Sequence, residues 1–140
     1  MRKQWIVRAA LAAIGVAGLW IAWSQNPASP LTLQKVTDNL YVIIGNGGNV
    51  AFLVTDEGVI LIDDKYDQDH DAILAQVKTI TDKPVKYVFN THYHSDHSGG
   101  NAKFLSSAEI ISHKNSRTNI VEHKQSNAEP NMQPARVVFS

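Results

Sequence analysis

Short apolar runs separated by turn residues fill the chain from residue 31 to residue 63. The runs are rich in β-branched and aromatic side chains, which favour strands. The last two are almost continuously apolar, so we expect strands that are covered on both faces. The four predicted strands are residues 31–36, 40–44, 50–55 and 59–63.

A helical period replaces this pattern after residue 66. Ile73, Val77 and Ile80 recur at the spacing of an amphipathic helix, which predicts a helix over residues 67–81. Pro84 follows its end. Strands and helices then alternate, so the chain is predicted to fold as a mixed α/β domain. The remaining predicted elements are strands at 85–89, 109–112 and 135–139 and helices at 100–107 and 115–124.

The N-terminal segment, residues 1–30, has the pattern of a targeting sequence. Three basic residues stand among the first eight, an uncharged apolar run covers residues 9–23, and a polar stretch with prolines follows. This order predicts a secretory signal and a periplasmic or secreted protein. A small-x-small cleavage site is not evident, so an uncleaved membrane anchor through residues 5–23 is the second expectation. The apolar run is shorter than the ~20 residues of a spanning helix, and a buried core helix is the third.

Composition narrows the class of protein. The chain has 140 residues, no cysteine and zero formal net charge. Residues 31–140 are enough for one domain with a modest core. The neutral charge offers no electrostatic reason to bind nucleic acid. Without cysteine, disulfides and thiolate metal ligands are excluded.

Four residues that can bind a metal lie within a window of six: His92, His94, Asp96 and His97. Imidazole and carboxylate suit zinc and similar divalent ions. Residues i and i+2 at a strand end point to the same side, so His92 and His94 are predicted to hold one ion. Asp96 and His97 follow a turn and are predicted to hold a second. The alternative is a histidine-rich surface loop, but the position directly after a buried strand argues against it.

Two glycine-containing stretches and the remaining histidines are given structural interpretations. Gly99 and Gly100 are predicted to let the backbone turn sharply before the next helix. The glycine-rich residues 45–49 fail the phosphate-loop pattern, because Val50 occupies the place of the third glycine, and are interpreted as a hairpin turn. The histidines outside the cluster are expected to be solvated surface residues: His70, His113 and His123.

The sequence Asn-Thr-His-x-His-x-Asp-His at residues 90–97, followed by Gly-Gly-Asn at 99–101, resembles the first metal-binding motif of the metallo-β-lactamase fold superfamily. The resemblance extends from about residue 31 to residue 139. It implies the N-terminal half of an αββα sandwich, with a mixed, mainly antiparallel sheet and flanking helices. It also implies that Asp63 orients the ligand loop by hydrogen bonds, whereas Asp64 is expected to face solvent.

The resemblance further implies a hydrolase that uses two zinc ions, and the N-terminal segment adds the expectation that it is exported. Metal-bound hydroxide would attack the carbonyl of a small-molecule ester, thioester, lactone or β-lactam. Asp96 would serve both as a ligand and as a catalytic acceptor that orients the nucleophile. A third histidine for the first ion, a bridging aspartate and a last histidine for the second ion would lie in the other half of the fold. The alternative is a truncated, non-catalytic fragment with weak metal binding, and a superfamily nuclease is disfavoured by the neutral charge.

Overall fold

The computed structural model describes residues 30–122 and 131–140. Residues 1–29 of the predicted signal or anchor, which was expected to cover 1–30, and His123 lie outside the described residues. No helix among the described residues is long and apolar enough to cross a membrane.

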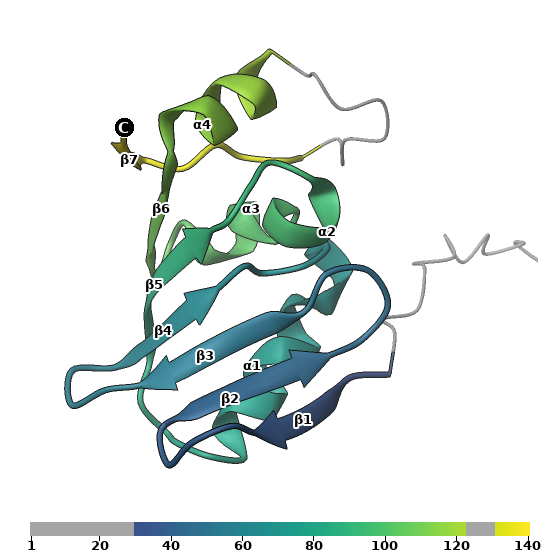
Figure 1. Ribbon diagram of the computed structural model, residues 1–140, viewed down its shortest axis with the longest axis vertical. Coiled ribbons are helices and arrows are strands. Elements are labelled where there is room, and N and C mark those ends of the chain that lie inside the picture. Colours follow the sequence, from purple (N-terminus) through teal and green to yellow (C-terminus); the bar gives the residue numbers. More distant parts are fainter. Residues whose placement is uncertain (1–29, 123–130) are drawn as a thin grey trace, which may run out of the picture.

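One mixed sheet forms the centre of the described chain, with its seven strands in sequence order (Figure 1). The first four strands pair antiparallel, and each later strand joins its predecessor in parallel. The strands are β1 Thr32–Lys35, β2 Leu40–Ile44, β3 Val50–Val54, β4 Val59–Ile62, β5 Val85–Asn90, β6 Glu109–His113 and β7 Val137–Phe139.

Helices occupy the connections between the parallel strands, as parallel pairing requires. The expected mixed sheet is confirmed, and its parallel pairings are as numerous as its antiparallel ones because helical crossovers follow β4, β5 and β6. The helix predicted at residues 67–81 starts with a 3₁₀ turn and ends at Lys78. The helical elements are η1 Asp67–Asp69, α1 His70–Lys78, α2 Ser95–Ser98, α3 Asn101–Phe104 and α4 Lys114–Val121.

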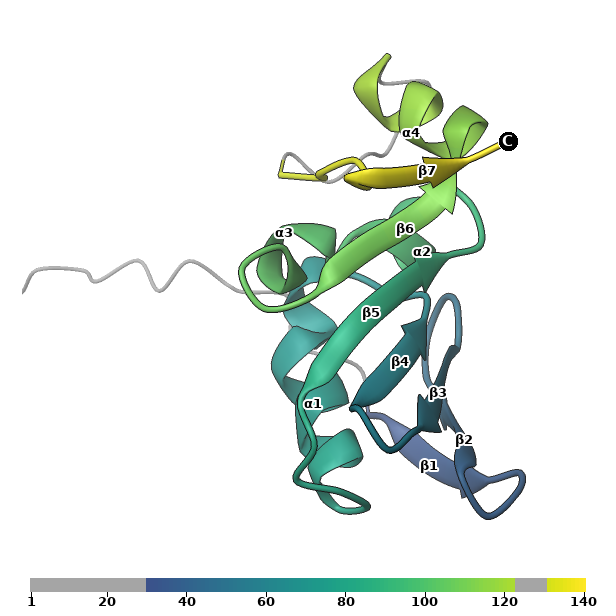
Figure 2. The same cartoon turned by 90° about the vertical axis from the view of Figure 1, so that its left-hand side faces the viewer.

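The core lies between one face of the sheet and the helices α1 and α3, which cover that face together (Figure 2). Burial of one large apolar side chain contributes about 1.5–3 kcal/mol, so this layer supplies most of the apolar stabilisation. A row of buried side chains crosses the sheet in register: Tyr41, Phe52, Leu61, Val88 and Ile110. From the helical side, Ile73, Val77 and Phe104 pack against the same cluster.

The opposite face of the sheet is apolar and only partly covered. The strand residues that alternate with those of the core point to this face and lie in register across it, among them Ile62, Phe89, Ile111 and Val137. Phe89 is 37% exposed and Val137 45%. No helix of the described chain lies over this face (Figure 2). One helical layer on one sheet is the half-sandwich that the resemblance implies.

Candidate metal centre

The ligand segment begins where β5 ends, at Asn90. Its chain bends through residues 91–94 and then enters α2, a four-residue helix that the sequence pattern did not predict. The carbonyl oxygen of His94 accepts hydrogen bonds from the backbone N–H groups of His97 and Ser98, both at 2.9 Å. The predicted ligands are therefore divided between a bend, which carries His92 and His94, and the first turn of a helix, which carries Asp96 and His97.

The first predicted pair lies together. His92 Nε2 is 3.2 Å from His94 Nδ1, and the two ring planes are inclined at 76°. Two nitrogens that bind one tetrahedral zinc ion at 2.0–2.1 Å are separated by about 3.3 Å. The separation of these two atoms therefore fits a single shared zinc ion.

The second predicted pair is adjacent to the first. Asp96 Oδ2 lies 3.5 Å from His97 Nε2, and the ring centroid of His97 is 4.0 Å from that of His92. Among the described residues, no three histidine, cysteine, aspartate or glutamate side chains converge on one ion. The predicted ligands thus lie as two neighbouring pairs, and their donor types are ones that suit zinc.

Asp63 contacts the ligand segment at three points. Its carboxylate accepts hydrogen bonds from the backbone N–H of Thr91 at 2.7 Å and from the Thr91 hydroxyl at 2.8 Å. Its Oδ2 also lies 2.7 Å from His97 Nδ1. A proton on Nδ1 that is donated to Asp63 leaves the Nε2 lone pair of His97 free to bind a metal. These are the contacts expected of Asp63, and their effect on metal binding stays a prediction.

The segment that carries Asp63 is bound to the ligand segment through its backbone as well. The N–H of Asp63 donates to Phe89 O at 2.8 Å, and the N–H of Asp64 donates to His97 O at 2.9 Å. Asp63 and Lys65 both have positive φ, at 64° and 58°. Non-glycine residues adopt this conformation at a cost, which is tolerated where surrounding contacts enforce it. The strain lies directly beside the predicted ligands.

The expectation that Asp64 faces solvent is wrong. Asp64 is fully buried, and its Oδ1 accepts a hydrogen bond from the N–H of Gly100 at 3.1 Å. Burial raises the pKa of Asp64 well above its ordinary value, and the neighbouring charge of Asp63 raises it further. In the sequence, Asp64 is only a polar residue after a predicted strand. In the structure, the residues that follow α2 cover its side chain.

The glycine at position 100 allows the chain after α2 to approach the backbone of Asp64 closely. Its φ of −76° is ordinary for any residue, so the predicted sharp turn is not the reason for a glycine here. A Cβ atom at this position would lie 2.7 Å from Asp64 O. The glycine is required because two backbone segments meet at this point.

Burial and neighbouring charges lower the pKa of His92. Burial is the largest cause, and the nearby imidazoles of His97 and His94 add to it, while Asp63 and Asp96 oppose it. The lowered pKa favours the neutral imidazole, which is the form that binds a metal.

Lys65 is a residue of this region that sequence reasoning missed. It is fully buried, and its Nζ donates hydrogen bonds to Asn46 O and Gly48 O in the turn between β2 and β3. Burial lowers the pKa of Lys65, and the carboxylates of Asp69 and Asp96 oppose that change. The surrounding carbonyl groups are distant in sequence, so no local pattern indicated this burial.

The other described histidines have structural partners. His70 was expected to be solvated, which is wrong: its side chain is 17% exposed, Nδ1 lies 2.8 Å from Asp71 Oδ1, and the ring packs edge-on against Phe104. His113 caps α4, because its Nδ1 accepts a hydrogen bond from the N–H of Asn115 at 3.1 Å.

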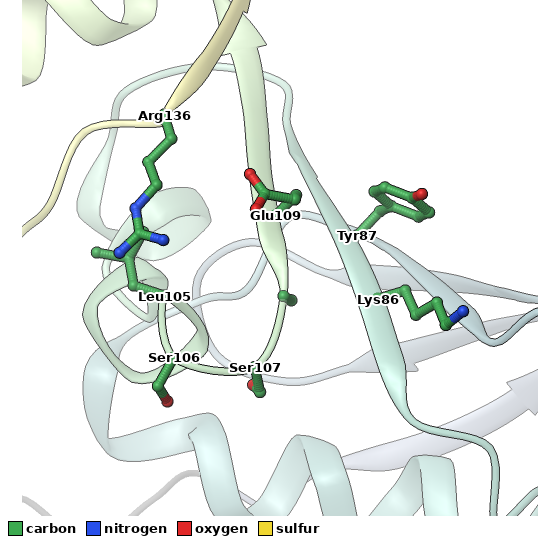
Figure 3. Close-up of a pocket in the computed structure, with 8 residues that line it drawn as sticks. Lys86, Tyr87, Leu105, Ser106, Ser107, Glu109 and Arg136 are labelled. Carbon is green, nitrogen blue, oxygen red and sulfur yellow. The ribbon is translucent and has the colours of Figure 1, made fainter.

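An open cavity of about 360 Å³ lies at the end of the strands opposite the ligand segment (Figure 3). It adjoins the beginnings of β5 and β6, whereas the ligand segment follows the end of β5. Arg136, which precedes β7, extends over it towards Leu105. This cavity is therefore not part of the candidate metal centre.

A mixed sheet with one helical layer, and with His-x-His-x-Asp-His at the end of a parallel strand, defines a class of metal-binding α/β proteins. The sequence profile of the metallo-β-lactamase superfamily matches residues 43–121, which is more than half of the chain. The chain therefore belongs to the metallo-β-lactamase superfamily. The superfamily includes hydrolases, and its members bind zinc and act on small molecules.

Individual relatives are more distant. A linear primary-alkylsulfatase from Pseudomonas sp. (strain ATCC 19151) is 38% identical over 58 residues, which are 40% of this chain and 11% of the relative. A subclass B3 metallo-β-lactamase of Bradyrhizobium japonicum superposes with a TM-score of 0.69 at 21% identity, over 83% of this chain and 48% of that one. A metallo-β-lactamase from Pseudomonas aeruginosa, solved in its mono-zinc form, superposes with a TM-score of 0.64 at 20% identity. The match covers 84% of this chain and 54% of that one.

The chain thus spans about half the length of these solved structures and a small part of the alkylsulfatase. At such identities the solved structures show the fold alone.

Proposed function

We propose that the protein is a metal-dependent hydrolase in which His92 and His94 hold one zinc ion, and Asp96 and His97 hold a second. The observation that carries the proposal is the pair of short separations, 3.2 Å within the first pair and 3.5 Å within the second, on one anchored segment. Membership of a superfamily that includes zinc hydrolases supports it.

Zinc in such a centre lowers the pKa of bound water to about 7 and polarises the oxygen atom of a substrate. The side chains of this chain would hold and orient the reactants. Asp96 offers a carboxylate oxygen that can accept a hydrogen bond from the attacking water. Catalytic zinc has three protein ligands, so each pair needs at least one more. We propose that these ligands lie in the half of the family fold that this chain does not span.

The substrate class is proposed on chemical grounds. Attack on a carbonyl suits an ester, a thioester, a lactone or a β-lactam, all of which develop negative charge on an oxygen that a cation stabilises. A second candidate is hydrolysis of a primary alkyl sulfate ester, which the 38% identity with the alkylsulfatase over 58 residues favours. A panel with one substrate from each class separates these possibilities.

The experiment measures zinc and turnover together. The complete gene product that contains this chain is titrated with zinc by calorimetry, its zinc content is determined, and the substrate panel is assayed. We expect two zinc ions per protein and hydrolysis of at least one class, both diminished by His92→Ala and by His94→Ala. His113→Asn is the matched control, because asparagine keeps the helix cap while one imidazole is removed.

Turnover that survives His94→Ala would contradict the proposal. Weak zinc binding without turnover on any substrate would favour the alternative, a non-catalytic fragment that binds metal weakly.

We also propose that residues 1–30 direct export, because Arg2, Lys3 and Arg8 precede the uncharged apolar run. Fusion of these residues to a reporter that is active only outside the cytoplasm tests this proposal. We expect reporter activity, and charged residues introduced into the apolar run should abolish it. A fusion that stays inactive although it is produced would contradict export.

A further inference from the structure

We infer that Lys65 is a positioning residue, which clamps the turn between β2 and β3 onto the Asp96–His97 ligand pair. The turn, residues 45–49, is called the hairpin turn below. The inference rests on the proposed function, because it assigns this turn and this lysine to the second zinc ion.

The side chain of Lys65 is committed to the hairpin turn. It has no exposure to solvent, and its ammonium donates to the carbonyl oxygens of Asn46 and Gly48. A lysine ammonium has three N–H donors and no acceptor, and burying it without partners is strongly destabilising. The two carbonyl groups supply those partners, so the position of the hairpin turn and that of the ammonium depend on each other.

The hairpin turn in turn lies against the second ligand pair; Figure 1 shows it reaching towards α2. A Cβ atom on Gly48 would lie 2.6 Å from Asp96 O and 2.7 Å from His97 Nε2. A Cβ atom on Gly47 would lie 2.9 Å from Asp96 Cβ. The backbone of the turn is therefore in contact with both residues of the pair, on the side of the metal-binding atom of His97.

The backbone of Lys65 contacts the residues that follow α2. Its carbonyl oxygen accepts a hydrogen bond from the N–H of Gly100 at 3.0 Å, just beyond the end of α2. Lys65 is held at a φ of 58° between these two sets of contacts. A single residue thus links the ligand helix, through its backbone, to the hairpin turn, through its side chain.

These contacts predict a selective effect. The hairpin turn touches Asp96 and His97, whereas His92 and His94 belong to the bend that precedes α2. Release of the turn should therefore disturb the second zinc ion more than the first. The ammonium also lies within electrostatic range of the Asp96 carboxylate, so its removal changes the surroundings of that ligand as well.

The test uses the complete gene product with Lys65→Met, which keeps the length of the side chain but removes its donors. Lys86→Met, at an exposed position in β5, is the matched control. In the metal-free protein, we expect faster amide hydrogen exchange at Gly47 and Gly48 for Lys65→Met alone. In stepwise zinc titrations, the second-ion step is identified as the one that Asp96→Ala abolishes, and the first-ion step as the one that His92→Ala abolishes. In Lys65→Met, the zinc affinity of the second-ion step should fall about 10-fold or more. The zinc affinity of the first-ion step should change less than about 2-fold.

A chemical rescue is available because these 140 residues contain no cysteine, and any cysteine elsewhere in the gene product is first replaced by serine. Lys65→Cys can be alkylated at that single thiol with 2-bromoethylamine in denaturant and then refolded. The sulfur displaces bromide, and the new thioether carries an ammonium of nearly the reach of lysine. We expect this modification to restore both the slow exchange of the hairpin turn and the second zinc step.

Unchanged exchange at Gly47 and Gly48 in Lys65→Met overturns the inference, and so does an equal loss of both zinc steps, which indicates a purely structural role. If Lys65→Met does not fold, Gly48→Ala displaces the hairpin turn while Lys65 stays intact, and an unchanged second step there overturns the inference. Failure of the proposed function is distinguished by the parent protein itself, which then shows no zinc steps at all.

Discussion

The imidazole of His97 is held between two carboxylates, and its Nδ1 lies 2.7 Å from Asp63 Oδ2. Its other nitrogen, Nε2, faces Asp96 Oδ2 at 3.5 Å. Metal-binding histidines commonly have this arrangement, in which a carboxylate partner fixes the tautomer and the orientation of the ring. Asp63 and His97 are 34 residues apart, so the fold and not the local sequence brings them together.

Asp63→Asn should weaken zinc binding at Asp96 and His97 by about 10- to 100-fold. The amide has one acceptor oxygen where the carboxylate has two. In one contact with Thr91 or His97, the amide NH₂ group would therefore face another hydrogen-bond donor. Asparagine tolerates the positive φ at this position, so the backbone should be preserved. Calorimetric zinc titration measures the effect. Asp38→Asn, at an exposed position beside Lys35, should leave the affinity unchanged, and equal affinities for the two variants would refute the role of Asp63.

Gly48→Ala should lower both the second-ion affinity and the free energy of unfolding. The added methyl group overlaps the backbone oxygen of Asp96, which cannot move aside as a flexible side chain can. Overpacking of this kind costs about 1–3 kcal/mol. Urea denaturation of the metal-free protein gives the stability change, and zinc titration gives the affinity. Asn49→Ala, at the exposed neighbouring position, should have little effect on either, and a neutral Gly48→Ala would show that the turn is free to move away.

Asp64 should make the metal-free protein less stable as pH rises above about 4. Its pKa is raised by burial, whereas the unfolded carboxyl group loses its proton near 3.8. Between these two pKa values the folded state binds more protons than the unfolded state, so the free energy of unfolding falls with increasing pH. Asp64→Asn should flatten this part of the profile, as measured by urea denaturation at several pH values. The exposed Asp56→Asn should follow the parent protein, and parallel profiles for all three proteins would contradict the prediction.

His92 should remain neutral below the ordinary imidazole value, because its pKa is lowered from 6.5. As pH falls through 6.5, the unfolded state takes up a proton before the folded state does, so acidification lowers the free energy of unfolding in this range. His92→Gln should remove part of this loss. Ring resonances followed by NMR, with His92→Gln for assignment, give the titration directly. A midpoint at or above 6.5 in the metal-free protein would exclude the proposed surroundings.

Much of the architecture was predictable from the sequence because each strand carries its own signal. The β-branched runs gave β2 to β6, and the period of Ile73 and Val77 gave α1. The proximity of the two predicted ligand pairs could be expected from their spacing after a buried strand, whereas metal binding by them stays a prediction. Residues whose surroundings come from distant segments were not: the partner of Asp64 is 36 residues away, and those of Lys65 are 17 and 19 residues away. The helix α2 has four residues, too few to show a period.

The strand β5 serves two surfaces at once. It places Tyr87 and Phe89 on the open apolar face, and two residues later it becomes the segment that carries His92. Whatever packs on that face must therefore restrain the strand from which the ligands extend. A layer that raised zinc affinity by some factor would itself be bound more tightly, by the same factor, once zinc is present.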